Sequence, residues 1–323
     1  MVTRAGGTAA LAVLVWMCAV AGLGAGPLGP GSAKAGTRIV IASGNALKWV
    51  PPHGGAPRTL VALPRAYGNT VDIAASEDGR RIAVLRREGV NGSHGSYYSI
   101  YTSKSGSPLR RRLSKNLIDV FPGPPTIALS PKGGTIALAV GEKIRLIPFG
   151  PGRVRHFEPI DACSYEDPSF SAGGRRIVFS CLRGPRSPRR GYDIYSAPLD
   201  GGPASRLTYD GRVDEIAPAL SPDGRLVAYV SHDSHVEEDR FELRVSWVGS
   251  FGSRFLAEVT AHTRPEFSPR GRSLVYAVVR NPETSYGKRY TLFTIRASGE
   301  NRRRVMPPSR PGPLVPQWTR GPG

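Results

Sequence analysis

The sequence predicts an all-β fold in which one four-stranded unit recurs around a ring. Three observations support this prediction. Glycine and proline are abundant, at 39 and 30 of 323 residues, and are spread along the chain, as is typical of a protein with many tight turns. No long amphipathic helical pattern follows residue 30. A hairpin motif also recurs five times at similar intervals.

The best-formed copy of this motif is A-P-A-L-S-P-D-G-R-L-V-A-Y at 217–229. Pro222 presets the backbone of a turn, and Gly224 takes the positive φ that a side chain would resist. The apolar run 226–229 has the length of a buried strand. The related copies lie at 73–84, 127–138, 167–179 and 264–276. The turn glycines are 54, 41, 50 and 47 residues apart, a period that is typical of propellers and solenoids.

Each copy is followed by a variable loop, a third strand, a turn of small residues and a fourth strand. The clearest example is D-I-Y-S-A-P-L-D-G-G-P-A-S-R-L-T at 193–208, and similar segments lie at 290–305 and 46–60. Four antiparallel strands per unit form the blade of a β-propeller. The repeat therefore predicts a propeller rather than a solenoid.

The two halves of the unit, P-x-[FWL]-S-P-D-G-x-x-[IV]-A-[FY] and D-I-Y…D-G-G-x-x-x-R-L-T, resemble the TolB-type propeller repeat. Similar repeats occur in the propeller domains of prolyl-oligopeptidase-type enzymes. The resemblance extends over 37–319 and is strongest in the blades that contain Phe170, Leu220 and Phe267. It implies an exported protein that docks partners rather than transforming them.

The two chain ends predict the number of blades. Segment 316–323 has the pattern of a first strand and its turn, whereas segment 37–43 has the pattern of a second strand. Placed one after the other, they reproduce the pattern of 168–180. A blade shared between the two ends would close the ring without an unpaired edge. We therefore expect a six-bladed β-propeller of four-stranded antiparallel blades that occupies 36–323 as a single domain.

The first 35 residues form a separate segment. A positive start at Arg4 precedes the apolar run 9–25, and Ala33-Lys34-Ala35 offers a small-x-small cleavage site. The run is short for a membrane span and contains several glycines, so a secretory signal peptide at 1–35 is favoured over an uncleaved anchor. The expected location is periplasmic, extracellular or in the cell envelope, with no transmembrane span after cleavage.

The chain is strongly basic, with a formal charge of +19, or +17 without Arg4 and Lys34. An exported protein does not meet the genome, so nucleic acid is not an expected partner. Anionic lipid head groups, cell-wall polymers and acidic proteins are the expected classes. Arginines recur on the predicted outermost strands, where protection of exposed strand edges is favoured over a basic binding rim. These arginines are Arg58, Arg110, Arg111, Arg112, Arg153, Arg155, Arg206, Arg302, Arg303 and Arg304.

Two cysteines remain outside the signal segment, Cys163 and Cys181. They flank a predicted hairpin whose turn lies near Ala172 and Gly173, which places them close together on adjacent antiparallel strands. In an oxidising compartment we expect a disulfide between them, and two buried thiols are the alternative. Their spacing matches no zinc motif.

Two variable loops are candidate ligand sites, on the face of the ring opposite the hairpin turns. The loop 182–191 holds Arg183, Arg186, Arg189 and Arg190, which could bind a carboxylate or phosphate. The loop 231–240 holds His232, Asp233, His235 and Glu237, residue types suited to a metal or to acid–base chemistry. Solvated polar loops are the alternative for both.

Catalysis and cofactor binding receive little support from the sequence. No nucleophile elbow, phosphate-cradling loop or dinucleotide motif is recognisable, so no cofactor, metal or catalytic residue is assigned. The expected function is binding, by a monomeric scaffold for a protein, a peptide or an anionic cell-envelope component. The alternative is a metal-assisted hydrolase or lyase that uses the loop containing His232.

Overall fold

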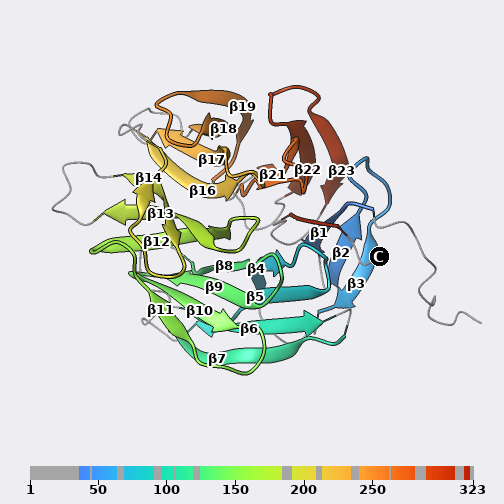
Figure 1. The fold of residues 1–323 in the computed structure, drawn as a ribbon. Coiled ribbons are helices and arrows are strands. Elements are labelled where there is room, and N and C mark those ends of the chain that lie inside the picture. Colours follow the sequence, from blue (N-terminus) through green and yellow to red (C-terminus); the bar gives the residue numbers. More distant parts are fainter. Residues whose placement is uncertain are drawn as a thin grey trace, which may run out of the picture. The chain divides into compact units, whose positions relative to one another are not determined.

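The computed structural model is an all-β protein with six four-stranded antiparallel sheets among its described residues (Figure 1). These residues are 36–43, 46–63, 69–90, 96–104, 107–118, 124–183, 191–208, 213–233, 240–261, 263–280, 289–309 and 316–320. The sheets succeed one another in chain order around a ring. The predicted six-bladed propeller is thus confirmed.

The blades are numbered from the N-terminus, and the strands of each are given from the inside of the ring outward. Blade 1 contains β24 (Gln317–Thr319), β1 (Arg38–Ser43), β2 (Ala46–Val50) and β3 (Arg58–Ala62). Blade 2 contains β4 (Asn69–Ala75), β5 (Arg81–Val90), β6 (Ser96–Lys104) and β7 (Arg110–Ile118). Blade 3 contains β8 (Thr126–Leu129), β9 (Thr135–Val140), β10 (Lys143–Pro148) and β11 (Arg155–Phe157).

The remaining three blades follow the same plan. Blade 4 contains β12 (Cys163–Phe170), β13 (Arg176–Arg183), β14 (Tyr192–Pro198) and β15 (Ser205–Arg206). Blade 5 contains β16 (Asp214–Leu220), β17 (Leu226–Asp233), β18 (Arg240–Trp247) and β19 (Ser253–Val259). Blade 6 contains β20 (Glu266–Phe267), β21 (Ser273–Arg280), β22 (Arg289–Arg296) and β23 (Arg303–Ser309).

Blade 1 is shared between the two ends of the chain, as the sequence predicts. Its inner strand β24 pairs with β1 through Arg38↔Thr319, Ile39↔Trp318 and Val40↔Gln317. The indole of Trp318 is buried in a cluster with residues of blades 1 and 6. The closing strand therefore joins the last blade to the first by packing as well as by hydrogen bonds.

The hairpin turns owe their recurrence to one hydrogen-bond pattern. At the turn of blade 5, the Leu226 amide donates to Ser221 Oγ at 2.8 Å, and Ser221 Oγ donates to Asp223 Oδ1 at 2.6 Å. Gly224 has a φ of +73°, where a side chain would be strained. The Ser76 turn of blade 2 repeats the arrangement with Asp78 as acceptor.

The hydrophobic core is divided among the contacts between neighbouring blades. Each of the six buried clusters in the described part of the chain draws its side chains from two adjacent blades. The cluster between blades 4 and 5, for example, combines Ile194 and Leu207 with Val227 and Tyr229. Because each blade buries one face against each neighbouring blade, it depends on both of its neighbours.

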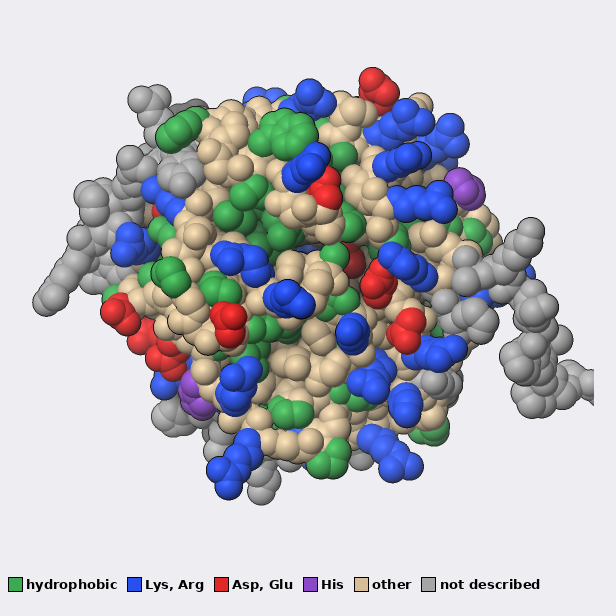
Figure 2. All heavy atoms as spheres, in the orientation of Figure 1, with side chains coloured by type: hydrophobic (Ala, Val, Ile, Leu, Met, Phe, Trp, Pro, Cys, Tyr) green, Lys and Arg blue, Asp and Glu red, His purple; other side chains and the backbone are tan. Residues whose placement is uncertain are grey.

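Basic side chains are distributed over the surface. Lys and Arg are spread widely over the face in Figure 2, with fewer Asp and Glu among them. Most arginines predicted for the outer edge lie there: β3, β7, β11, β15 and β23, each the outermost strand of its blade, begin or end with arginine. Arg153 and Arg302 instead lie just before β11 and β23. This placement agrees with protection of the exposed strand edges. No helix in the described ranges is long and apolar enough to cross a membrane.

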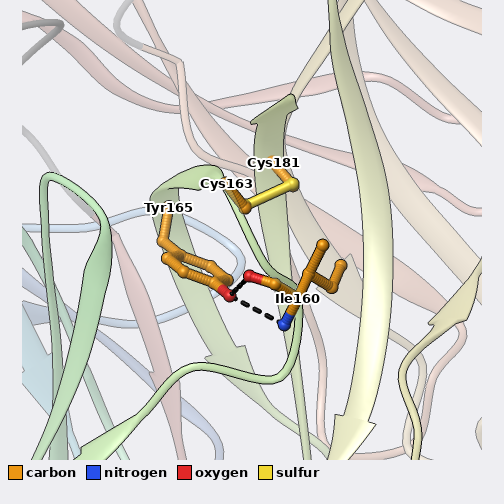
Figure 3. The surroundings of a disulfide bond; sticks show 4 residues. All are labelled: Ile160, Cys163, Tyr165 and Cys181. Atoms are coloured by element: carbon orange, nitrogen blue, oxygen red, sulfur yellow. Dashed lines mark hydrogen bonds between the residues drawn. A yellow bond between two sulfur atoms is a disulfide. The ribbon is translucent and has the colours of Figure 1, made fainter. Parts of the chain in front are cut away.

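The predicted disulfide is confirmed between Cys163 on β12 and Cys181 on β13, whose Cα atoms are 5.6 Å apart (Figure 3). The two residues occupy diagonal positions of the ladder, since Cys163 faces Arg183 and Cys181 faces Tyr165. Beside the bond, the Tyr165 hydroxyl donates to the Ile160 carbonyl and accepts from the Ile160 amide (Figure 3). Bond and tyrosine together fix the chain as it enters blade 4.

Candidate functional site

A cavity of about 430 Å³ lies where the inner strands of all six blades converge. Its walls come from the first strand of each blade and from the hairpin turn that follows. Pro131, Ala172, Pro222, Pro269 and Arg320 are turn residues among its lining. The cavity therefore extends along the ring axis toward the hairpin-turn end of the propeller, which we call the turn face.

One repeat position supplies three of the charged residues of this cavity. It is the residue four before the serine that opens each hairpin turn, and we call it the ring position. In blades 2 to 6 it is occupied by Asp72, Thr126, Asp167, Ala217 and Arg264. Equivalent positions of a closed ring face the same axis, so residues far apart in the sequence meet there.

Arg264 joins three alternate blades across the axis. Its Nη1 lies 2.5 Å from Asp72 Oδ2 of blade 2, and its Nη2 lies 2.8 Å from Asp167 Oδ1 of blade 4. Asp72 is 1% exposed on its side chain and Arg264 is 27% exposed. We call these three residues the charged triad. One guanidinium serves two carboxylates, an arrangement suited to its forked donors.

Backbone amides hold the two carboxylates of the triad in place. The amides of Ile73 and Ile127 donate to Asp72 Oδ1 and Oδ2, each at 2.8 Å. The amide of Ala217 donates to Asp167 Oδ2 at 3.1 Å. Each carboxylate thus also ties its own blade to the next one, blade 2 to 3 and blade 4 to 5.

Strand irregularities aim these residues at the axis. The ladder of β12 shifts register between Glu166 and Ser169, and Asp167 takes a φ of +48°. The same shift occurs in β16, where Ala217 has a φ of +53°. Bulges of this kind redirect a side chain out of the regular alternation of a strand.

The electrostatics of the triad combine burial with pairing. Burial raises the pKa of Asp72, while Arg264 and the Ile127 amide oppose that rise. The carboxylates of Asp167 and Asp72 raise the pKa of Arg264, against the effect of its burial. With both carboxylates ionised, the triad carries one net negative charge. Arg264 is therefore committed to structure and leaves little capacity for a ligand anion.

Glu266, in blade 6, is a second ionisable residue of the cavity wall. It is only partly buried, and burial raises its pKa to about 8. Its Oε2 accepts a hydrogen bond from the Trp318 amide at 3.3 Å, and the Trp318 indole donates to the Glu266 carbonyl at 3.0 Å. The raised pKa favours the protonated carboxyl at neutral pH, which can both donate to and accept from a ligand.

A third group of polar residues lies between blades 4 and 5, toward the variable loops. Burial and the neighbouring Asp167 raise the pKa of Glu166 to about 7, and the Tyr192 hydroxyl donates to Glu166 Oε1 at 2.9 Å. The Tyr192 amide donates to Asp214 Oδ1, and Asp214 Oδ2 lies 3.7 Å from His232 Nδ1. The polar groups of the triad thus continue through the ring toward its other face.

The structure describes three of the loop residues predicted as ligand-binding candidates. The imidazole Nδ1 of His232 lies near the carboxylate of Asp214, and its ring stacks on Phe241 with ring centroids 4.2 Å apart. Asp233 is the last residue of β17, and Arg183 ends β13. Arg183 hydrogen-bonds Tyr195, whose pKa burial raises and Arg183 lowers.

The other loop candidates lie outside the described residues: Arg186, Arg189, Arg190, His235 and Glu237. The two loop sites therefore stay predictions. Within the described ranges, no group of three or more His, Cys, Asp or Glu residues is arranged to hold a metal ion.

The residues of the central cavity were not predicted from the sequence, although a signal for them was present. When the hairpins are aligned on their turn serine, Asp167 and Arg264 fall in one column that starts otherwise apolar strands. Opposite charges at one position of a closed ring predict an ion pair across the axis. Glu266 stands two residues further on, where other blades have Ala74, Ala128 or Ala219.

Comparison with known proteins identifies the fold. No protein-family model and no curated protein matches the chain. Among solved structures, TolB from Acinetobacter baumannii has 19% identity and a TM-score of 0.66, and covers 88% of this chain. This chain spans 66% of that protein's length. A putative TolB from Agrobacterium tumefaciens has 16% identity and a TM-score of 0.56, with 88% of this chain and 97% of the other covered.

A third similar structure is the nidogen/laminin complex, with 13% identity and a TM-score of 0.59, covering 86% of this chain and 96% of the other. At these identities the similarity concerns the fold. The chain thus has the propeller fold found in TolB structures, as its repeat implies. The function has to be argued from its own residues.

Proposed function

We propose that this protein is an exported, monomeric binding module that holds a segment of a protein partner in its central cavity. The observation that carries the proposal is the cavity itself, which has non-repeating side chains at repeating positions. The charged triad accounts for part of this variation, and the rest of the lining varies as well. Apolar, acidic, basic and amide side chains alternate around the axis.

The lining suits an extended peptide segment. Phe170, Phe267 and Trp318 provide apolar walls, and several prolines present rings without amide donors. The protonated carboxyl of Glu266 and the amide of Gln317 can each donate and accept hydrogen bonds. Such a mixture of apolar surface and a few polar groups is typical of ligand cavities. A structure of the same fold is described as a nidogen/laminin complex, and this fold-level analogy agrees with a protein partner.

Export is supported by the disulfide between Cys163 and Cys181, since such bonds persist in oxidising compartments. The signal segment 1–35 lies outside the described residues and remains a proposal. The mass of the intact protein recovered from the exporting cell tests it. A chain that begins near Gly36 is expected, and one that retains Trp16 and Cys18 would contradict cleavage.

The cavity is tested by filling it. Ser169 lines the cavity and is only partly buried, so Ser169→Trp should occupy part of its space without replacing any residue of the charged triad. Ser205→Trp, on the exposed outer strand of the same blade, is the matched control. Immobilised wild-type protein and the control should retain the same envelope proteins, and Ser169→Trp should lose them. Equal retention by all three would exclude the cavity as the binding site.

The alternative, a metal-assisted hydrolase or lyase, depends on the loop that contains His232. The described contacts of His232 are with Asp214 and Phe241, and its proposed companion His235 lies outside the described residues. No observation on the described residues favours this function over binding. Metal analysis of the purified protein separates the two, because stoichiometric metal lost in His232→Ala/His235→Ala would favour the enzyme.

A further inference from the structure

One hairpin of the outer ring exposes an unusual concentration of aromatic side chains. Among the described residues, six large hydrophobic side chains are exposed, and four of them lie within 247–255. They are Trp247 at 61%, Val248 at 37%, Phe251 at 86% and Phe255 at 47%. These residues occupy the end of β18, its turn and the start of β19. Hydrophobic side chains are visible over this part of the face in Figure 2.

This hairpin lies at the turn face. Successive strands of a blade run in opposite directions, so the turn between the third and fourth strands lies at the same end as the turn between the first and second. A hydrogen bond from the Val248 amide to the Arg225 carbonyl, at 2.8 Å, joins the two turns of blade 5 directly. The exposed aromatic residues and the mouth of the central cavity therefore share one end of the propeller.

The turn face is also rich in exposed positive charge. Arg225, Arg254 and Arg272 lie on or next to the turns of blades 5 and 6, and all three are exposed. Other exposed cations on the turns of this face are Arg80, Lys132, Arg153, Arg175, Arg270, Arg302 and Arg320. Its acids are Glu77, Asp78, Asp200, Asp223 and Glu300. The cations outnumber the acids around the exposed hairpin and around the face as a whole.

A hollow of about 540 Å³ adds to this charge on the opposite side of the ring, between blades 2 and 3. Arg81, Lys104 and Arg110 line it together with Phe149, and its lining includes no acid. Arg81 is oriented by a hydrogen bond to the Gly133 carbonyl at 3.0 Å. The hollow has the size and charge to receive an anionic head group.

We propose that the turn face docks on an anionic lipid bilayer, with the aromatic hairpin of blade 5 entering the interfacial region. Tryptophan and phenylalanine on a basic surface suit this region, where apolar rings insert and cations meet phosphates. A stable protein interface buries about 800 Å² per partner, whereas the aromatic exposure here is confined to one hairpin. The hairpin and the hollow of blades 2 and 3 lie on opposite sides of the ring, and a planar bilayer can contact both at the same time. The inference rests on the proposed export but not on the peptide cavity.

Co-sedimentation with vesicles tests the proposal. The purified protein should bind vesicles of mixed phosphatidylglycerol and phosphatidylcholine and bind phosphatidylcholine alone far more weakly. Trp247→Ala/Phe251→Ala should reduce binding to the anionic vesicles at least tenfold, because both rings lose their insertion into the interface. Tyr97→Ala is the matched control, since Tyr97 is 41% exposed but lies on β6 at the end away from the turn face. Unchanged melting temperatures would show that the variants fold.

The proposal would be overturned by no binding to anionic vesicles, by equal binding to phosphatidylcholine alone, or by unchanged binding of the double variant. A dimer in sedimentation velocity that the double variant abolishes would assign the hairpin to a second copy of the chain and would also overturn it. Ser169→Trp should bind vesicles as the wild type does. Loss of its partner with retained vesicle binding therefore separates the two proposals.

Discussion

The most consequential single residue is Arg264, because two carboxylates depend on one guanidinium. The side chain of Asp72 is 1% exposed and that of Asp167 is 11% exposed. Bulk water therefore cannot solvate either carboxylate if the guanidinium is lost. Removing one partner of a buried ion pair is far more costly than replacing all partners by neutral groups. The triad should therefore respond very differently to single and combined substitution.

Arg264→Leu is expected to lower the free energy of unfolding by about 3–5 kcal/mol, measured by urea denaturation. The combined variant Arg264→Leu/Asp72→Asn/Asp167→Asn should recover much of this loss, because no buried charge is left unpaired. A combined variant as unstable as the single one would show that the stability comes from the packing of Arg264 and not from its charge.

The raised pKa of Glu266 predicts a pH dependence of stability. Its pKa is about 8 in the folded protein and near the ordinary 4.5 in the unfolded chain. Between these values the folded protein binds a proton that the unfolded chain has released. The free energy of unfolding should therefore fall as the pH rises from about 4.5 to 8, by a few kcal/mol at most, and then level off.

Glu266→Gln should flatten this dependence and make the protein more stable than the wild type at pH 8, as measured by melting temperature. Glu166, whose pKa is raised to about 7, leaves a residual slope that ends near pH 7. The same slope in the variant and the wild type up to pH 8 would contradict a raised pKa of Glu266 in the folded protein.

The charged triad was not predicted from the sequence, although the repeat contains the shared position of its residues. The repeat aligns Asp167 with Arg264, so their shared place at the axis follows from the fold. The register shift at Glu166–Ser169 and the positive φ of Asp167 do not follow from the pattern, because propensity does not favour that conformation for a non-glycine residue. The direction of the side chain, and hence the triad, required the structure.

At the scale of single elements, the recurring hairpins and the shared blade were predictable because turn chemistry is local. Ser221, Asp223 and Gly224 satisfy one another within a few residues, so the sequence specifies the turn without tertiary context. The disulfide followed from the same hairpin geometry. The loops that were expected to hold ligands contain no comparable turn motif, so their conformation could not be predicted from the sequence.

The inner strand of the shared blade should contribute strongly to stability. Deleting residues 313–323 removes the strand β24 and the buried indole of Trp318, and it exposes the edge of β1. Loss of a buried tryptophan alone costs about 3–5 kcal/mol, so the melting temperature should fall on the order of 10 °C. A truncated protein that melts with the full-length one would contradict the closing role of β24.

The disulfide should stabilise blade 4 by restricting the unfolded chain. Cys163 and Cys181 are 18 residues apart, and closure of a loop of that length is worth roughly 3 kcal/mol. Cys163→Ala/Cys181→Ala should therefore lower the free energy of unfolding by about this amount in urea denaturation. The wild type in reductant is the control, and it should match the variant. Equal stability of the variant and the oxidised wild type would contradict the expectation.

At the scale of the whole molecule, the turn face repeats in backbone but varies in side chains. Its described residues include the cavity mouth, the aromatic hairpin and many exposed arginines. The sequence directed attention to the variable loops of the other face, because loops of uneven length usually carry function. The regular hairpin motif of the turn face predicted only an architectural role, so the variation among its side chains was not recognised in the sequence.

The net charge, +17 without Arg4 and Lys34 of the signal segment, predicts that binding to an anionic bilayer weakens with salt. The two contributions to that binding can be separated. Each arginine near an anionic surface adds about 1 kcal/mol at low salt, so Arg225→Gln/Arg272→Gln should bind roughly thirtyfold more weakly there and lose less on salt addition. Salt does not screen the insertion of aromatic rings.

Trp247→Ala/Phe251→Ala should thus bind more weakly than the wild type at every salt concentration, but its binding should decline with added salt as steeply as that of the wild type. If both double variants shifted binding without changing its salt dependence, the arginines of the turn face would not contact the bilayer.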